Sequence, residues 1–325
     1  MAPRLVDPED LFRRAGVPAG EPFRASSTGL HSKLLHELTQ WGYLRRLSRE
    51  VYVRCEVPDT LGLRSRAVAL VLAPGAVVTD VTAAWLHGID LLPAKDLSAV
   101  PEVCAFHVDK GGRVMRNGVT SGQRMMPESD ITEVNGVPVT TMLRTACDLG
   151  RLQWRERAFA ALDAFLHAGV DKDELLINVD RFGGYRGVRQ LRAFAPLADG
   201  RADSVAESIM RLRWLDAGLP TPSLQCPVDG PGATWFLDLG LEDLYYAVEY
   251  DGAEFHSSPE QVEHDRSRRE WIAANTPWIV DVIGKDMLFT DDMGFEAMVR
   301  RRIAEARQTL ANRVRGRRWF VEPGE

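Results

Sequence analysis

The sequence lacks paired cysteines. Its four cysteines are far apart, and none belongs to a C-x-x-C pair. They are Cys55, Cys104, Cys147 and Cys226. Neither a zinc site nor a disulfide framework is therefore indicated. We expect all four to be small hydrophobic residues of the interior.

A long apolar run is also missing. The longest one, residues 67–93, is interrupted by Pro74, Asp80 and His87, which argues against a membrane-spanning helix. The first ten residues include Asp7, Glu9 and Asp10, where a signal peptide would need an apolar core. We expect a cytoplasmic protein with no membrane contact.

Positive charge is not in excess. The 325 residues include 40 Lys and Arg against 46 Asp and Glu, a formal net charge of -6, which argues against wholesale binding of polyanions. Arginines nevertheless concentrate near both ends of the chain: Arg45, Arg46, Arg49 and Arg54, then Arg300, Arg301, Arg302, Arg307, Arg313, Arg315, Arg317 and Arg318. Such runs are more often solvated helix faces than nucleic-acid tracks, although arginine enrichment over lysine favours phosphate contact.

The first 58 residues predict a winged-helix-like domain. Apolar residues at helical spacing predict a helix from His31 to Trp41, which Gly42 ends. Residues 43–54 fit a hairpin with its turn at 48–50 and arginines on its strands. The exposed face of the helix would carry polar residues suited to a DNA groove, namely His31, Ser32, Lys33, His36, Thr39 and Gln40.

This order resembles the N-terminal domain of the AbiEi family, antitoxins and regulators of type IV toxin–antitoxin systems. In that family a helix precedes Gly-x-Leu-x-Arg and a Gly-Val-Tyr turn, but here Arg49 and Glu50 precede Val51 and Tyr52 without the glycine. The resemblance implies DNA contact through Lys33, Arg45, Arg46 and Arg49. The alternative is a small helical domain that binds protein.

The AbiEi resemblance continues into residues 59–195, which we expect to form an α/β middle domain. It is carried by residues 82–90, by residues 136–149 and by a helix expected over residues 153–168. The single histidines His87 and His107 are expected to be hydrogen-bonded core groups, and residues 183–187 a turn before a helix. Residues 195–203 contain Pro196 and Gly200 and predict a linker.

Acidic residues on two adjacent strands mark the last third of the chain. Residues 222–228, 234–241 and 245–251 predict three successive strands, which place Asp238 on the second and Glu249 with Asp251 on one face of the third. Two neighbouring carboxylates repel each other unless a positive group lies between them. A divalent metal ion is the favoured partner, and a salt bridge from Asp238 to Arg211 or Arg268 is the alternative.

The order Asp, then Glu-x-Asp-Gly, then an aromatic residue and His resembles the PD-(D/E)XK nuclease superfamily, specifically its DUF559 and very-short-patch-repair branch. The resemblance covers about residues 204–312. It implies that Asp238, Glu249 and Asp251 bind Mg²⁺ or Mn²⁺ and that His256 assists the leaving group. Asp251 takes the place of the usual lysine.

Three further residues belong to this predicted site. An acid on the preceding helix often reaches the metal in the superfamily, a role open to Glu207, which also fits the capping box Ser204-x-x-Glu207. Arg266 and Arg269 would face a DNA duplex. The catalytic set is therefore predicted to be Asp238, Glu249, Asp251, His256 and Glu207.

The fold class expected is α/β (α+β), with domains at residues 1–58, 59–195 and 203–325. The last would be a mixed sheet flanked by helices, ending in an arginine-rich helix. Two functions follow as hypotheses. One is a metal-dependent DNA endonuclease; the other is a catalytically inactive AbiEi-like regulator or antitoxin that binds DNA, a toxin or another defence-system partner.

Overall fold

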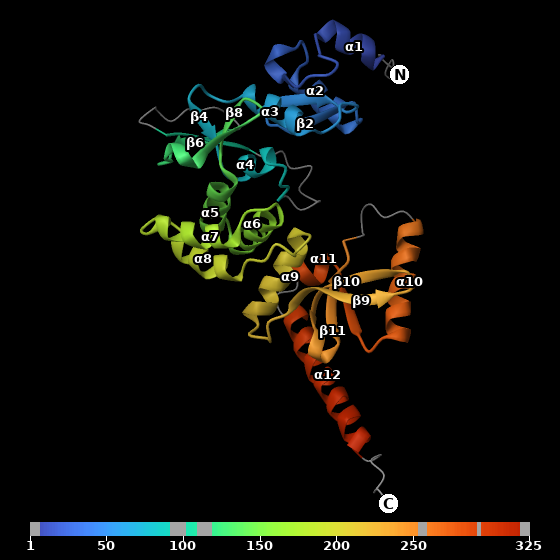
Figure 1. Ribbon diagram of the computed structural model, residues 1–325. Coiled ribbons are helices and arrows are strands. Elements are labelled where there is room, and N and C mark those ends of the chain that lie inside the picture. The colour runs from blue at the N-terminus through green and yellow to red at the C-terminus, as the bar shows by residue number, and fades with distance from the viewer. Residues whose placement is uncertain (1–6, 92–101, 109–118, 253–258, 291–293, 319–325) are drawn as a thin grey trace, which may run out of the picture. The chain divides into compact units, whose positions relative to one another are not determined.

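The computed structural model describes residues 7–91, 102–108, 119–252, 259–290 and 294–318. Within these ranges the chain forms twelve α-helices and three sheets (Figure 1), which confirms the mixed α/β class. It divides into two compact units, one of residues 1–153 with 170–196 and the other of residues 154–169 with 197–325. The three-domain division of the sequence stays a prediction.

The first unit begins with the expected helix and basic hairpin. Its elements are α1 (Pro8–Ala15), β1 (Phe23–Arg24), the 3₁₀ helix η1 (Ala25–Ser27), α2 (Ser32–Gln40), β2 (Leu44–Ser48) and β3 (Val51–Arg54). The strands form an antiparallel sheet in the order β1-β3-β2. Helix α2 is capped by His31, whose ring nitrogen accepts the Leu34 N–H. The helix buries Leu35 and Leu38 against the sheet residues Leu44 and Tyr52.

A five-stranded sheet and three following helices complete the first unit. The elements are α3 (Leu61–Ala69), β4 (Ala76–Val78), α4 (Asp80–Leu86), β5 (Val103–His107), β6 (Val119–Gln123), η3 (Glu128–Asp130), β7 (Ile131–Val134), β8 (Val137–Thr140), α5 (Met142–Leu152), α7 (Lys172–Val179), η4 (Asp180–Phe182) and α8 (Val188–Phe194). The strand order is β6-β5-β4-β8-β7, with parallel pairing of β5 to β6 and of β4 to β8. The turn expected before a helix at 183–187 is confirmed, because α8 follows it directly.

The second unit contains the predicted strand meander. Its elements are α6 (Arg155–His167), η5 (Ala195–Leu197) at its border, α9 (Val205–Asp216), β9 (Ser223–Gly230), β10 (Ala233–Leu241), η6 (Glu242–Leu244), β11 (Tyr246–Tyr250), α10 (Pro259–Asn275), β12 (Ile279–Ile283), α11 (Lys285–Phe289) and α12 (Gly294–Arg318). The strand order is β12-β11-β10-β9, antiparallel except for the parallel pair β11 and β12.

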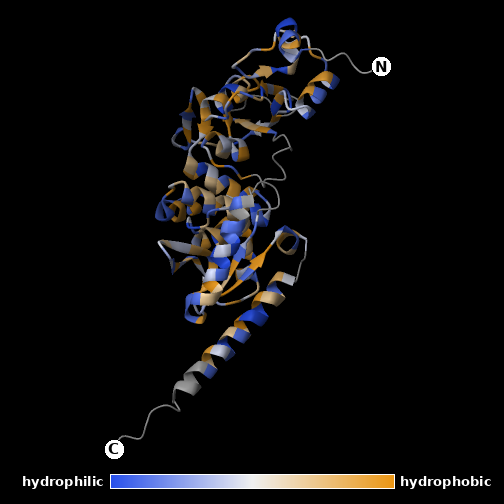
Figure 2. Cartoon of the chain, turned by 90° about the vertical axis from the view of Figure 1, so that its right-hand side faces the viewer, coloured by the Kyte–Doolittle hydropathy of each residue, from blue (hydrophilic) through white to orange (hydrophobic). Residues whose placement is uncertain are grey.

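Both faces of the second sheet are covered by helices. One face packs Leu239 and Val248 against Trp214 of α9 and Phe295 of α12. The other face packs its apolar residues against Ile272 of α10. Hydrophobic and hydrophilic residues alternate along α12 (Figure 2), as an amphipathic helix on a sheet requires. The sheet is therefore the central layer of this unit.

Helix α6 belongs to the second unit because it pairs with α9. The Arg211 guanidinium on α9 donates two bonds to the Asp163 carboxylate on α6, at 2.6 and 2.7 Å, and both side chains are buried. The boundary between the two units falls after Pro196, inside the stretch 195–203 that predicts a linker, and Ala195, Ala198 and Ala202 in this stretch are buried. Small side chains let this segment pack closely, and that feature is not visible in its proline and glycine content.

The cysteine and histidine expectations hold only in part. Cys147 and Cys226 are buried, and burial raises their thiol pKa to about 12 and about 11. Cys104 is half-buried, and Cys55 is exposed where β3 ends, so the interior position expected for it is wrong. His87 Nε2 donates to the Thr140 carbonyl at 2.8 Å, the hydrogen bond expected of it, whereas His107 Nε2 is buried without a hydrogen-bond partner among the described residues. Among the described helices, none is both long and apolar enough to cross a bilayer.

Candidate functional site

The acidic residues of the last third lie where strands β10 and β11 separate. The two strands pair from Leu241, which lies opposite Tyr246, to Leu239, which lies opposite Val248. Beyond that point the Asp238 carboxylate accepts the backbone N–H of Tyr250 at 2.8 Å. A side chain therefore replaces a ladder bond between main chains, and the fork that results holds Asp238 beside Glu249.

Burial and neighbouring acids keep Asp238 from ionising readily. Its pKa is raised to about 7, first by burial and then by the negative charges of Glu207 and Glu249, which outweigh the Tyr250 N–H and the more distant Arg268. Asp238 is thus partly protonated near neutral pH. The salt bridge considered as an alternative is not formed, since Arg211 binds Asp163 and Arg268 binds Glu249.

Glu207 forms the capping box. Its backbone N–H donates to the Ser204 hydroxyl at 3.1 Å, and that hydroxyl donates back to the Glu207 carboxylate at 2.8 Å. The same carboxylate accepts the Asp203 N–H at 2.9 Å and the Gln225 amide at 3.2 Å. Burial raises its pKa. Glu207 therefore caps helix α9 and also adds negative charge to the fork.

Two arginines of helix α10 face the carboxylates of β11. Arg268 donates to Glu249 Oε1 at 2.7 Å, and Arg269 donates to Asp251 at 3.0 Å. Glu249 is buried, and its Oε2 lies 3.6 Å from Arg269 Nε, too far for a hydrogen bond. That oxygen is a buried atom with no hydrogen-bond partner among the described residues. The fork thus holds two guanidinium groups, those of Arg268 and Arg269, and four carboxyl groups, those of Glu207, Asp238, Glu249 and Asp251.

The carboxylates have the right chemistry for Mg²⁺ or Mn²⁺ but not the right arrangement. Hard divalent ions prefer carboxylate oxygens. However, Arg268 and Arg269 engage oxygens of Glu249 and Asp251 that a cation would need. No group of three or more His, Cys, Asp or Glu side chains in the described ranges is placed to hold a metal ion. The residues as arranged do not fit the ion, and His256 lies outside the described residues.

The predicted DNA-binding residues of the N-terminal region differ in their surroundings. Lys33 on α2 is exposed, as are Arg46 and Arg49 at the hairpin. Arg46 donates to the Ser48 and Arg49 carbonyls and lies over the Tyr52 ring. Arg45 is half-buried and donates to the Val57 carbonyl at 3.0 Å. The side chains most accessible to a phosphate are therefore those of Lys33, Arg46 and Arg49.

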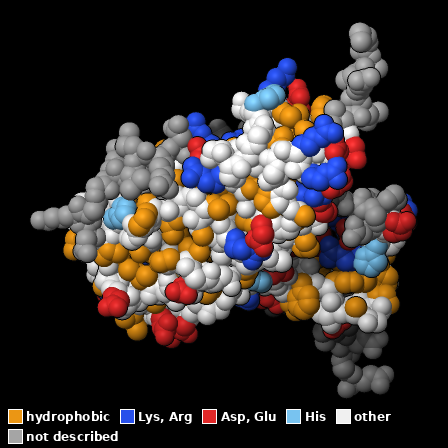
Figure 3. Space-filling view, turned by 90° about the horizontal axis from the view of Figure 1, so that it is seen from above, with side chains coloured by type: hydrophobic (Ala, Val, Ile, Leu, Met, Phe, Trp, Pro, Cys, Tyr) orange, Lys and Arg blue, Asp and Glu red, His pale blue; other side chains and the backbone are white. Residues whose placement is uncertain are grey.

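Of the two arginines expected to face a duplex from α10, one is turned inward. Arg266 is exposed and pairs with Glu263 on its own helix at 2.7 Å. Arg269 instead binds Asp251. On the face of the molecule seen in Figure 3, basic and acidic side chains are interspersed. The basic residues there do not form one broad positive patch.

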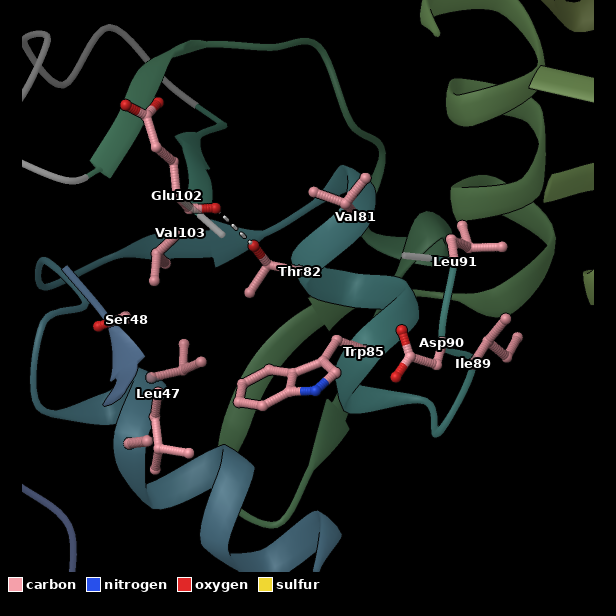
Figure 4. A pocket seen from close by; sticks show the side chains of 12 residues that line it. Leu47, Ser48, Val81, Thr82, Trp85, Ile89, Asp90, Leu91, Glu102 and Val103 are labelled. Atoms are coloured by element: carbon pink, nitrogen blue, oxygen red, sulfur yellow. Dashed lines mark hydrogen bonds between the residues drawn. The ribbon is translucent and has the colours of Figure 1, made fainter. Parts of the chain in front are cut away.

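Among the pockets formed by the described residues, two in the first unit are considered for binding. The smaller has a volume of about 30 Å³ and is lined by residues of β2, α3, α4 and β5. In Figure 4 the Trp85 indole lies in the middle of the lining side chains and the Glu102 carboxylate points away from it. This volume suits one or two waters. The second pocket, of about 470 Å³, is lined by Val108, Met125, Met126, Pro127, Arg144, Arg181, Phe182 and Tyr185.

A buried network of arginines and aspartates lies beneath the second pocket, and no sequence pattern predicted it. Asp148 accepts from Arg144 at 2.9 Å and from Arg151 at 2.7 Å, and Asp130 accepts from Arg144 at 2.6 Å and from Arg181 at 2.9 Å. The only signal was arginine and aspartate at helical spacing in residues 144–151, which is also common on solvated helices.

Comparison with known proteins identifies the middle of the chain. Residues 75–197 match the family model described as the AbiEi antitoxin C-terminal domain. These residues run from the start of β4 to the end of η5 and contain the second pocket and its charged network. The AbiEi resemblance is thereby confirmed for residues 75–197, whereas the winged-helix resemblance of the first 58 residues stays a prediction. The nuclease resemblance of the last third stays a prediction.

Two proteins of Mycobacterium tuberculosis are similar over a longer stretch. They bear the names "Uncharacterized protein MT2308" (strain CDC 1551 / Oshkosh) and "Uncharacterized protein Rv2248" (strain ATCC 25618 / H37Rv). Each is 34% identical over 229 residues, which is 70% of this chain and 80% of the relative. The chain therefore belongs to the same family as these two proteins, with a segment similar to the AbiEi antitoxin C-terminal domain at its centre.

Proposed function

We propose that the protein is an AbiEi-like regulator or antitoxin, which binds DNA through its N-terminal helix and hairpin and a protein partner through residues 75–197. The observation that carries this proposal is the family match of residues 75–197. A helix and a basic hairpin precede that segment in the chain. This is the order that the sequence shares with AbiEi regulators.

The N-terminal residues are suited to DNA in a specific way. Helix α2 presents exposed Ser32, Lys33, His36 and Gln40, which can donate to or accept from base edges. The hairpin presents the exposed guanidinium groups of Arg46 and Arg49. We therefore expect DNA binding to depend on these few side chains.

A gel-shift series tests DNA binding. The probe is a duplex from immediately upstream of the protein's own coding sequence, titrated with full-length protein at several salt concentrations. Lys33→Ala and Arg49→Ala should each weaken binding and lower the salt slope by about 0.9 for each phosphate that the side chain neutralised. Arg192→Ala is the control, since Arg192 is an exposed arginine on α8, away from helix α2 and the hairpin. Equal binding by all four proteins would refute the DNA part of the proposal.

Metal-dependent cleavage of DNA is the second candidate function. It is favoured by the fork, where burial and then the negative charges of Glu207 and Glu249 raise the pKa of Asp238 to about 7. Carboxyl groups crowded in this way gain from a positive partner. Arg268 and Arg269 would have to release Glu249 and Asp251 before a divalent ion could use those oxygens.

Plasmid nicking in Mg²⁺ or Mn²⁺ tests this second candidate. If the protein has this second function, the wild type cuts, whereas Asp238→Asn and Glu249→Gln should lose the activity by a factor of at least ~100, because each removes one carboxylate from the fork. Asp243→Asn is the control, since Asp243 is an exposed acid of η6. Undiminished cutting by both fork variants would contradict a role for these residues in hydrolysis.

A further inference from the structure

We propose that the pocket of Met125, Arg144, Arg181, Phe182, Tyr185 and their neighbours binds an acidic side chain flanked by apolar residues, supplied by a partner protein. We call this set of residues the arginine pocket. This proposal rests on the proposed function, because it names the surface by which the AbiEi-like segment would recognise its partner. Its volume of about 470 Å³ lies within the range of established binding pockets.

The charged network beneath the arginine pocket has one positive charge in excess. Four guanidinium groups contact three carboxylates: Arg124 binds Asp80 and Asp148, Arg144 binds Asp148 and Asp130, Arg151 binds Asp148, and Arg181 binds Asp130. The three aspartates are buried. A carboxylate that entered the pocket would bring the number of negative charges to four and would balance the network.

Two members of this network line the pocket. Arg144 is buried and fixed on three sides, by Asp148, Asp130 and the Met125 carbonyl. Arg181 is half-exposed and is held at Asp130 by bonds of 2.9 and 3.0 Å. Their guanidinium groups are therefore already oriented before a ligand arrives, which reduces the entropy lost on binding.

The rest of the pocket is apolar or aromatic. Phe182 and Met126 are buried, and the Arg144 guanidinium lies over the Phe182 ring at 5.3 Å. Met125 is 75% exposed and Tyr185 is 38% exposed. An exposed methionine and tyrosine beside a cationic floor fit an apolar side chain next to an acidic one. The pocket is open toward solvent, so a side chain on another protein can reach it.

Short peptides provide the test. Three fluorescein-labelled peptides with blocked ends, GSLELSG, GSLQLSG and GSLKLSG, are titrated into full-length protein and followed by fluorescence anisotropy. The Glu peptide should bind roughly tenfold more tightly than the Gln peptide, as expected for a charge-assisted bond, and the Lys peptide should bind least. In protein with ¹³C-methyl methionine, the Met125 and Met126 signals should shift during the titration.

Two pairs of variants locate the effect. Arg181→Gln should reduce the preference for Glu over Gln by roughly fivefold, whereas Arg192→Gln, which changes another half-exposed arginine, should leave it within about twofold. Met125→Ser should weaken the Glu and Gln peptides equally. Ile177→Ser is its control, because Ile177 is 70% exposed outside the pocket.

Four results would overturn the proposal. The first two are equal affinity for the Glu and Gln peptides and equal effects of the two arginine variants. The third is the absence of binding up to roughly 1 mM peptide. The fourth is that inorganic phosphate or a DNA duplex displaces the Glu peptide at a lower concentration than the Gln peptide needs to displace it. The gel shift of wild-type protein distinguishes a wrong pocket from a wrong function. If DNA still binds but the peptide preference is absent, only the arginine pocket fails.

Discussion

At the scale of single residues, Asp238 has the most unusual environment among the acids of the second unit. Its carboxylate replaces a main-chain bond where β10 and β11 separate, and the fork holds more carboxyl groups than guanidinium groups. The native protein therefore binds a proton at Asp238 more tightly than the unfolded chain does. This difference makes its stability depend on pH.

We expect Asp238→Asn to flatten that dependence. The folded pKa of about 7 lies above the ordinary value of 3.8, so the stabilisation from proton binding is complete below pH 4 and is lost as the pH rises through 7. Wild-type protein should thus lose roughly 2 to 4 kcal/mol of stability between pH 5 and pH 8, and the variant clearly less. Urea denaturation at both pH values measures this. Asp243→Asn, at an exposed site, should behave like wild type.

Two glycines with the same backbone conformation allow a test of packing. Gly187 and Gly184 have φ of +77° and +81°, but a Cβ at Gly187 would lie 1.7 Å from the Arg151 carbonyl oxygen, whereas a Cβ at Gly184 would meet no described heavy atom within 4 Å beyond its two chain neighbours. Gly184→Ala should cost about 1 to 2 kcal/mol, the cost of the left-handed conformation alone. Gly187→Ala should cost at least ~3 kcal/mol or prevent folding. Similar melting temperatures for the two variants would contradict this.

At the scale of elements, much of the fold could be predicted because its signals are local. The helix ending at Gly42, the hairpin at residues 44–54 and the strands β9, β10 and β11 lie within two residues of their predicted bounds. Caps and alternating patterns are set by neighbours in the chain. For the same reason, the capping box of Glu207 was one of the two roles foreseen for it.

Contacts between distant residues could not be predicted in the same way. Arg268 and Arg269 meet Glu249 and Asp251 from 18 or 19 residues along the chain, and nothing in the spacing says that they turn inward. Arginine on a charged helix is most often solvated. The pairing of α6 with α9 is also non-local, because Asp163 and Arg211 are separated by 48 residues. These contacts decide how the fork and the second unit are built.

Breaking the α6–α9 pair should be costly. Arg211→Met leaves the buried Asp163 carboxylate without its bidentate partner and should destabilise the protein by about 3 to 5 kcal/mol. Replacing both residues, as Asp163→Leu with Arg211→Met, should recover part of that loss. Arg201→Met removes an exposed ion pair with Asp199 and should cost no more than about 1 kcal/mol. Thermal melts of the four proteins measure these losses of stability, and equal losses for Arg211→Met and Arg201→Met would argue against a structural role of the buried pair.

At the scale of the whole molecule, the division into units predicts which fragments fold. A fragment of residues 203–325 contains the sheet of the second unit but lacks α6, so it exposes the apolar surface that α6 covers and leaves Arg211 without Asp163. We expect that fragment to lack a cooperative urea transition, and residues 154–325 to show one. A sharp transition of the shorter fragment, at the same urea concentration as the longer one, would be inconsistent with this role of α6.

The path of the chain between the units has a consequence for inheritance. It passes from one unit to the other after residues 153, 169 and 196. A single recombination event joins two genes at one position, so no such event can transplant either unit intact into another protein. A crossover before α6 transfers the second unit together with residues 170–196, which belong to the first unit. A crossover after residue 196 transfers the second unit without α6. The two units should therefore descend together, as one indivisible gene segment.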